Sequence, residues 1–249
     1  MSEKLERKQF PVLILADFSD GSWYASSFAM QYLYHNDSSI FILQTHENRG
    51  WGHFMMRNLS HSLKKITKYD LQQLKNKLLF NFSIKKDQIN TLSIEGNLNA
   101  VLQYKLLIKD EYFVTLSIYS SFPDSCNRQN KYLEKLIDNS HHPLFILSGD
   151  FNKQPNKKIS FVGNSCKIPS KSLVDQVLKI CKETQSTLEI LFVLFNEVQK
   201  ISDDVFNFYI ENFKTIEYEI KQVAGDTKYK GLKDHLGDKT KDLLVIENS

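Results

Sequence analysis

The histidines and cysteines that could serve as metal ligands or nucleophiles are few in this sequence and stand apart from one another. His141 and His142 are adjacent, but no cysteine or suitably spaced histidine completes a metal-binding set. We interpret them as charges at the end of a helix. Cys181 lies on an apolar stripe, while Cys126 and Cys166 have no neighbouring histidine to activate a thiolate. The sequence therefore predicts neither a metal site nor a thiol-based catalytic centre.

Composition and charge narrow the classes of protein further. The chain has 249 residues, 41% of them hydrophobic, and its 32 basic residues against 29 acidic ones leave a net charge of +3. Such a balance does not favour nucleic acid or a membrane surface as a partner. No apolar run approaches the ~20 residues that span a bilayer, and the run after residues 1–10 is too short for a signal peptide. Because the cysteines are also sparse, with no CxxC pair, we expect a globular cytoplasmic protein.

Short, continuous apolar runs alternate with amphipathic helical stripes along the chain. Runs such as 12–15, 40–43 and 144–147 are typical of strands that helices cover on both faces. Between the runs, apolar residues recur at helical spacing, as they do from Ala25 to Leu33. This alternation predicts repeated βαβ units, and so an α/β fold with a mainly parallel sheet.

The order of strands and helices starts again after a polar, lysine-rich linker around Pro155. The second series of elements includes a strong strand at 188–195 and a last one at 243–246. We interpret the chain as a diverged tandem repeat, with one domain at residues 8–150 and a second at 155–249. The first repeat continues for one more helix and strand after its fourth strand, so we expect the second domain to lack those two elements.

Four short motifs follow one another in the order of the predicted elements. They are Val12-Leu13-Ile14-Leu15-Ala16-Asp17-Phe18-Ser19 with Ser22 and Ala25 after it, Leu43-Gln44-Thr45-His46, Glu95-Gly96-Asn97, and His142-Pro143. In this order they resemble the universal stress protein family. The resemblance covers about residues 9–149 and recurs weakly to residue 249, and the series of elements carries it rather than one sharp motif.

The resemblance implies doubly wound parallel sheets of strand order 3-2-1-4-5, with any ligand outside the carboxyl ends of the strands. Many members bind ATP there through a glycine-rich loop after strand four, because phosphates need bare backbone N–H groups. This chain has no glycine between Gly96 and Gly149. It therefore departs from the family's ATP signature, and we expect no cofactor.

Two residues match ligand-contacting positions of the family. Asp17 corresponds to the acidic residue at the mouth of the ATP pocket, and Thr45 to the strand-two position whose backbone meets adenine. Asp17 has a second interpretation, as a cap on the helix that follows it or as a turn former. Leu15 stands where ATP binders often have proline, and the equivalent turn of the second repeat, 162–165, has no acid.

A further motif points to a different class of protein. Gly149-Asp150-Phe151-Asn152 resembles a motif of Mg²⁺-dependent endonucleases and phosphodiesterases of the DNase I type, in which the Asp and Asn act on the scissile phosphate. Glu47 and the pair Asp234-His235 are the residues that could complete such a site. That fold is a β-sandwich, however, and the flanks of the Asp-His pair differ from its terminal motif. We therefore favour a polar turn after a buried strand.

Taken together, these patterns lead us to expect a universal-stress-protein-like module without enzymatic activity, which acts through association or small-ligand binding. The strands at 144–147 and 243–246 would each leave an apolar sheet edge, and chains usually cover such edges. We predict that both edges are buried, either between the two repeats or across the axis of a homodimer.

Overall fold

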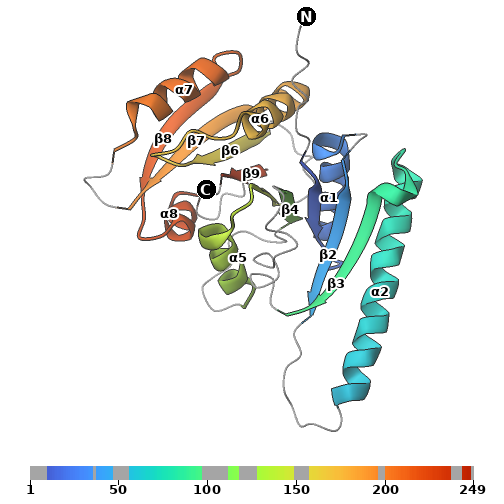
Figure 1. Ribbon diagram of the computed structural model, residues 1–249. Coiled ribbons are helices and arrows are strands. Elements are labelled where there is room, and N and C mark those ends of the chain that lie inside the picture. The colour runs from blue at the N-terminus through green and yellow to red at the C-terminus, as the bar shows by residue number, and fades with distance from the viewer. Residues whose placement is uncertain are drawn as a thin grey trace, which may run out of the picture.

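The computed structural model describes residues 10–35, 38–46, 56–96, 112–117, 128–148, 157–195, 200–236 and 243–247. The described strands form one nine-stranded sheet in the order β3-β2-β1-β4-β5-β9-β6-β7-β8, with helices on both faces (Figure 1). Every neighbouring pair of strands is parallel except β5 and β9. The α/β fold with a mainly parallel sheet, expected from the sequence, is confirmed.

The first half of the sheet has the strand order 3-2-1-4-5 that the family resemblance implied. Its strands are β1 (Val12–Leu15), β2 (Ile40–His46), β3 (Ile89–Glu95), β4 (Phe113–Ser117) and β5 (Leu144–Leu147). Its helices are α1 (Asp20–Phe28), which continues as the π-helical turn η1 (Ala29–Leu33), then α2 (Met56–Asn81), the short 3-10 turn η2 (Lys86–Gln88) and α5 (Arg128–Asn139).

The second half repeats the first four strands of that arrangement, in the order β8-β7-β6-β9. Its elements are β6 (Lys158–Gly163), α6 (Lys171–Thr184), β7 (Thr187–Leu194), α7 (Asp203–Phe213), β8 (Tyr218–Ala224), α8 (Lys228–Leu236) and β9 (Leu243–Ile246). The domain limits at 8–150 and 155–249 stay a prediction, and residues 149–156 lie outside the described part of the chain.

The two halves join where β5 and β9 pair side by side in opposite directions. Leu144 lies opposite Ile246 and Leu147 opposite Leu243, and all eight residues of the two strands are buried. From the sequence we expected one sheet in each repeat, whereas the structure has a single nine-stranded sheet that includes both. Each edge strand covers the apolar surface and the free N–H and C=O groups of the other. Of the two arrangements predicted for these edges, the structure has the pairing within one chain.

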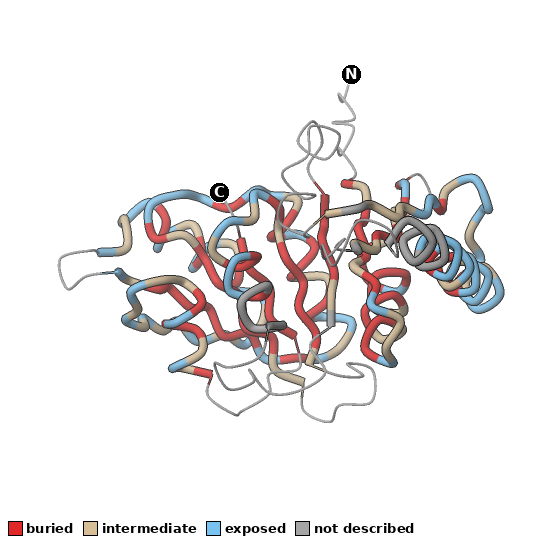
Figure 2. The backbone as a smooth tube through the Cα atoms, turned by 90° about the horizontal axis from the view of Figure 1, so that it is seen from below, coloured by how far each residue is buried: buried red, intermediate tan, exposed pale blue. Residues whose placement is uncertain are grey.

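Side chains from alternating strand positions fill two hydrophobic layers, one on each face of the sheet. Ile42 faces the layer beneath α1, α2, α6 and α7, and its neighbour Leu43 faces the layer beneath α5 and α8. Figure 2 shows the buried residues following the strands through the middle of the molecule. Both layers contain residues from both halves, so the two repeats share one core.

Two polar contacts between helices tie the halves together outside the sheet. The buried side-chain amide of Gln176 on α6 donates to the main-chain carbonyl of Tyr32 in η1. On the other face of the sheet, the N–H of Tyr229 at the start of α8 donates to the carboxylate of Asp138 on α5, at a distance of 3.0 Å. A carboxylate of the first half therefore caps a helix of the second.

We predict that Asp138→Ala destabilises the protein through α8. The substitution leaves the Tyr229 N–H without its acceptor, and loss of a helix cap costs about 1 kcal/mol. Urea denaturation should show a lower free energy of unfolding by about this amount. The exposed Asp175 on α6 provides the control, because Asp175→Ala should change the free energy by less than about 0.5 kcal/mol. Equal losses in the two variants would contradict the prediction.

Candidate functional site

The strand order reverses at two places in the sheet, and a doubly wound fold places ligands at such points, outside the carboxyl ends of the strands. In the first half the reversal lies between β1 and β4, and in the second between β6 and β9. The residues that follow β1, β6 and β9 are therefore the candidate site residues. Residues 118–127, which follow β4 and include the predicted glycine-free loop, lie outside the described part.

Asp17 follows β1 and is held at the N-terminus of α1 by two serines. Its Oδ1 accepts the Ser19 N–H at 3.0 Å, the Ser19 hydroxyl at 2.5 Å, and the Ser22 hydroxyl. The Ser22 hydroxyl in turn accepts the Asp17 N–H at 2.7 Å. Phe18 between them has φ of 60°, a left-handed conformation that non-glycine residues rarely adopt. The turn thus folds the carboxylate back onto the first turn of the helix.

These hydrogen bonds set the charge of Asp17. Partial burial raises the pKa of its carboxyl, but the hydrogen bonds from Ser19 and Ser22 outweigh burial and hold the pKa below its ordinary value. Asp17 therefore carries a full negative charge at neutral pH. The helix cap itself is Ser19, whose hydroxyl accepts the Ser22 N–H, so the contacts of Asp17 fit the turn-forming interpretation. A role in ligand binding stays a prediction.

Thr45 lies near the carboxyl end of β2, half-buried and opposite Ile94 of β3. The N–H of Ala16 donates to the carbonyl of Leu43, which fixes the end of β1 against β2. The structure thus places Asp17 just after β1 and Thr45 near the carboxyl end of the adjacent parallel strand β2, at the same edge of the sheet. Contact between Thr45 and a ligand remains a prediction.

The reversal point of the second half is organised around Glu247, which directly follows β9. Its N–H donates to the carbonyl of Val162 at 3.0 Å, and its side chain accepts the N–H of Asn164 at 3.4 Å. The ammonium of Lys228 lies 3.4 Å from the main-chain carbonyl of Glu247. Residues from β9, from the loop after β6 and from α8 therefore converge here.

Tyr209 of α7 closes this point from the other face of the sheet. Its ring is fully buried, and its hydroxyl lies against Gly163 at the end of β6. A Cβ atom at position 163 would lie 2.3 Å from that hydroxyl oxygen, so only glycine leaves room for it. The glycine makes the close approach of α7 to β6 possible.

Burial shifts the pKa values of the groups around Glu247. Burial raises the pKa of the Glu247 carboxyl to about 7, although the Asn164 N–H, Lys228 and Lys167 oppose the shift. Burial also lowers the pKa of Lys228, against the attraction of Glu247 and Asp138. Perturbed groups of this kind are common at functional sites.

The turn after β6 has no acid, and Glu247 was not among the site residues predicted from the sequence. The acid comes instead from the end of β9, on the neighbouring strand. A signal was present, because Glu247 directly follows the apolar run 243–246. Tyr209 gave no such signal, since an aromatic residue on an apolar helical stripe is typical of a core position.

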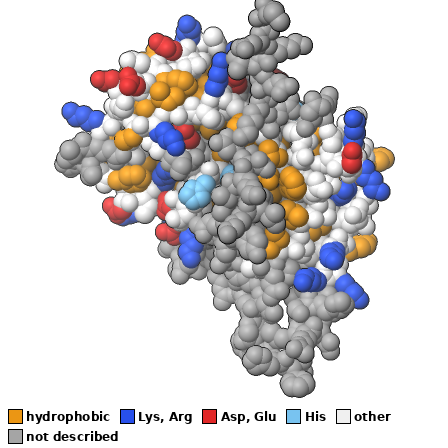
Figure 3. All heavy atoms as spheres, viewed as in Figure 1, with side chains coloured by type: hydrophobic (Ala, Val, Ile, Leu, Met, Phe, Trp, Pro, Cys, Tyr) orange, Lys and Arg blue, Asp and Glu red, His pale blue; other side chains and the backbone are white. Residues whose placement is uncertain are grey.

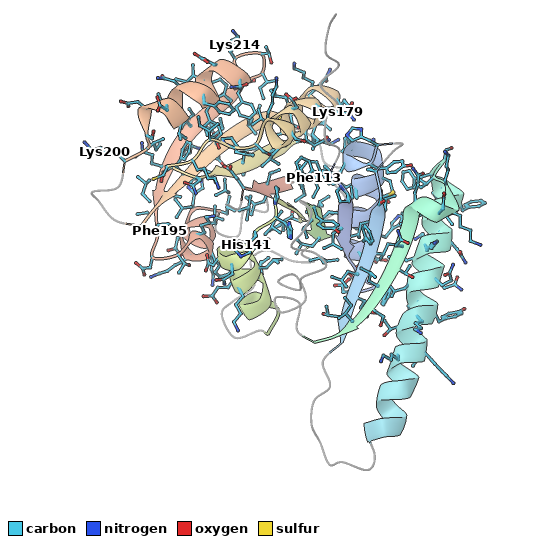
Figure 4. The ribbon with its side chains drawn as sticks, in the orientation of Figure 1. Phe113, His141, Lys179, Phe195, Lys200 and Lys214 are labelled. Atoms are coloured by element: carbon cyan, nitrogen blue, oxygen red, sulfur yellow. The ribbon has the colours of Figure 1, made fainter. Side chains whose placement is uncertain are left out.

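The other residues singled out in the sequence have structural surroundings. His142 is buried and its Nδ1 accepts the Tyr112 N–H at 3.4 Å, while burial and then His141 lower its pKa. His141 is exposed just after α5 (Figure 4). Cys181 is buried in the core, where desolvation raises the pKa of its thiol to about 12. Within the described ranges, no group of three or more histidine, cysteine or acidic residues could hold a metal ion.

The residues of the phosphodiesterase alternative are only partly within the described structure. Glu47 and the run Gly149-Asp150-Phe151-Asn152 lie outside it. Asp234 and His235 lie on α8, where Asp234 is exposed and the His235 Nε2 is 3.5 Å from the carboxylate of Glu189. The histidine thus belongs to an ion-pair cluster on the sheet face under α8.

Comparison with known proteins rests on structure alone. No family model matches the sequence, and no curated protein matches it. The fold is similar to that of a universal stress protein from Archaeoglobus fulgidus DSM 4304, with a TM-score of 0.50 and 13% identity over 86% of this chain and 77% of that one. The chain has the fold of a universal stress protein. The resemblance found in the sequence is confirmed at this level.

Two further solved structures are less similar to this chain by TM-score. A putative universal stress protein from Pseudomonas aeruginosa UCBPP-PA14 has a TM-score of 0.43 and 12% identity, over 97% of this chain and 94% of that one. The cytoplasmic domain of a prokaryotic cation chloride cotransporter has a TM-score of 0.46 and 10% identity, over 96% and 95%. In the present chain, none of the described helices is both long enough and apolar enough to cross a membrane.

We predict that Gly163→Ala destabilises the fold mainly through overlap with Tyr209. The new methyl group would overlap the Tyr209 hydroxyl, and overpacking of this kind costs about 1–3 kcal/mol. In a Tyr209→Phe background the atom of closest overlap is gone, and ring carbons of residues 209 and 192 remain at 2.9 and 3.1 Å, so the same substitution should cost less. Urea denaturation of the four proteins gives the coupling energy. A loss that is identical in the two backgrounds would show that the hydroxyl is not the obstacle.

Proposed function

We propose that the chain is a universal-stress-protein-like regulatory module of the stress response, without enzymatic activity, which acts through association or a small ligand and does not bind ATP. The observation that carries the proposal is the sequence between Gly96 and Gly149, which holds no glycine, whereas ATP binders of the family hold phosphate on a glycine-rich loop after strand four. The N-terminus of α1 is a second place where backbone N–H groups and the helix dipole could attract phosphate.

Here the chain's own negative charge occupies that position. Asp17 accepts the Ser19 N–H and two serine hydroxyls, so these donors are already used. A phosphate brought to the same place would meet a carboxylate whose low pKa keeps it ionised at neutral pH. The glycine-free sequence between Gly96 and Gly149 supports the same conclusion.

The same geometry supports a non-enzymatic role. The hydroxyl groups of Ser19 and Ser22 both donate to the carboxylate of Asp17. A carboxylate with a lowered pKa is a poor general base, because catalysis at neutral pH needs a base whose pKa lies near 7. This acid therefore holds the serines as donors rather than activating them as nucleophiles.

Association is the other part of the proposal. Because β5 and β9 cover each other within one chain, the homodimer predicted from the sequence needs another surface. Figure 3 shows hydrophobic side chains gathered over α7, where Phe206 and Ile210 are exposed, and Phe80 on α2 is 90% exposed. We retain a cytoplasmic location, with neither nucleic acid nor a membrane as partner, and the free thiols of Cys166 and Cys181 agree with a reducing compartment.

We predict that calorimetry with ATP and Mg²⁺ finds a dissociation constant weaker than about 1 mM, which is about −4 kcal/mol. Asp17→Asn, and Asp20→Asn at the exposed acid that begins α1, should both leave binding this weak, because neither substitution supplies the missing glycine-rich loop. Neither ATP nor a phosphodiester should be hydrolysed by the wild-type chain. A micromolar constant for the wild-type chain would contradict the proposal.

A further inference from the structure

The second half contains two buried acids whose surroundings differ sharply. The side chain of Glu189, in β7, is 1% exposed, and Glu247, after β9, is 6% exposed. Both are glutamates near the same sheet, so burial alone gives them a similar desolvation cost. What separates them is the compensation that each carboxylate receives.

Glu189 is surrounded by donors and cations. Its Oε1 lies 2.8 Å from the Lys221 ammonium and 3.2 Å from that of Lys158, and its Oε2 accepts the Ser160 hydroxyl at 3.0 Å. The imidazole of His235 stands 3.5 Å away. Buried carboxylates that remain charged are paired in this way.

Glu247 has far less compensation. Its carboxylate accepts the backbone N–H of Asn164 at the long distance of 3.4 Å. The Lys228 ammonium, which could neutralise it, is hydrogen-bonded to the main-chain carbonyl of the same residue. The other groups that face the carboxyl are Lys167 after β6 and the Tyr209 hydroxyl on α7, while Asp138 on α5 acts on Lys228.

The contrast shows that this fold can surround one buried acid with cations and donors and leave another with few. We propose that Glu247 is a pH switch at the end of β9. The pairing of β9 that joins the two halves is more stable when the Glu247 carboxyl is protonated and less stable when it is ionised. The inference concerns regulation of the joint and goes beyond the proposed function, because it holds whether or not a ligand binds.

The position of Glu247 explains why its protonation state can affect the stability of β9. The residue directly follows the strand that pairs with β5 on one side and β6 on the other. Its main chain bonds both to Val162 on β6 and to Lys228 at the start of α8. An ionised carboxylate must either move out to water or draw the Lys228 ammonium away from the carbonyl. The first movement breaks the contact of the carboxylate with the Asn164 N–H, and the second breaks the bond from Lys228 to the main-chain carbonyl at the end of β9.

The direction of the pH effect follows from the two protonation states. Burial raises the pKa of Glu247 from its ordinary 4.5 to about 7 in the closed state. Opening therefore releases a proton between these values, so the closed state loses stability as pH rises through this window and the effect levels off above about pH 7. From about pH 6 to pH 8 the opening equilibrium of β9 should increase about tenfold.

Hydrogen exchange of the amides of β9, read by mass spectrometry across this pH range, tests the proposal on the whole chain. Glu247→Gln keeps the side-chain size and cannot ionise, so it should remain closed at every pH. The ratio of wild-type to variant exchange at each pH cancels the intrinsic pH dependence of exchange. We expect that ratio to increase about tenfold from about pH 6 to pH 8.

Two further measurements distinguish a pH switch at Glu247 from a merely structural role of this residue. Glu183→Gln, at an exposed acid on α6, should leave the pH dependence of the wild-type chain unchanged. A ¹³C titration of the glutamate carboxyls in the wild-type chain should find one that titrates near neutral pH and is absent from Glu247→Gln. The proposal is overturned by parallel pH profiles in wild type and Glu247→Gln, or by ordinary titration of every glutamate.

Discussion

The antiparallel pairing of β5 with β9 is the interaction on which the rest of the structure depends. Each of these four-residue strands is wholly apolar and buried, and each would be an exposed sheet edge without the other. Their pairing satisfies both backbones, extends the two hydrophobic layers across the molecule and brings α5 against α8. The cap from Asp138 to α8 and the bond from Gln176 to η1 are possible only because this joint sets the distance between the halves.

Most of the fold could be predicted from the sequence because parallel strands with helices on both sides leave a strong local pattern. The apolar run at Val12–Leu15 and the stripe after it identify a βα unit by themselves. The merging of two sheets into one could not be predicted in the same way. Strands 144–147 and 243–246 show that they need a partner, but their residues do not say which one, since any apolar edge would serve.

The two candidate sites differ in the same way, because one is set by local sequence and the other by distant segments. Asp17 could be found because it lies in a local motif, and its contacts with Ser19 and Ser22 span only a few residues. Glu247 acquires its properties from Val162, Lys228 and Tyr209, which are separated from it by tens of residues and come from three other elements. A pKa that depends on burial by distant segments leaves little trace in the local sequence.

Because β5 and β9 are antiparallel, the strands of the second half run opposite to those of the first. All strands of the first half run parallel to β5, and all those of the second run parallel to β9. The carboxyl ends of the two sets therefore emerge at opposite margins of the sheet, related by an approximate two-fold axis perpendicular to it. The environments of Asp17 and Glu247 face away from each other, so a single small molecule cannot bridge them. Any communication between them has to pass through the strands.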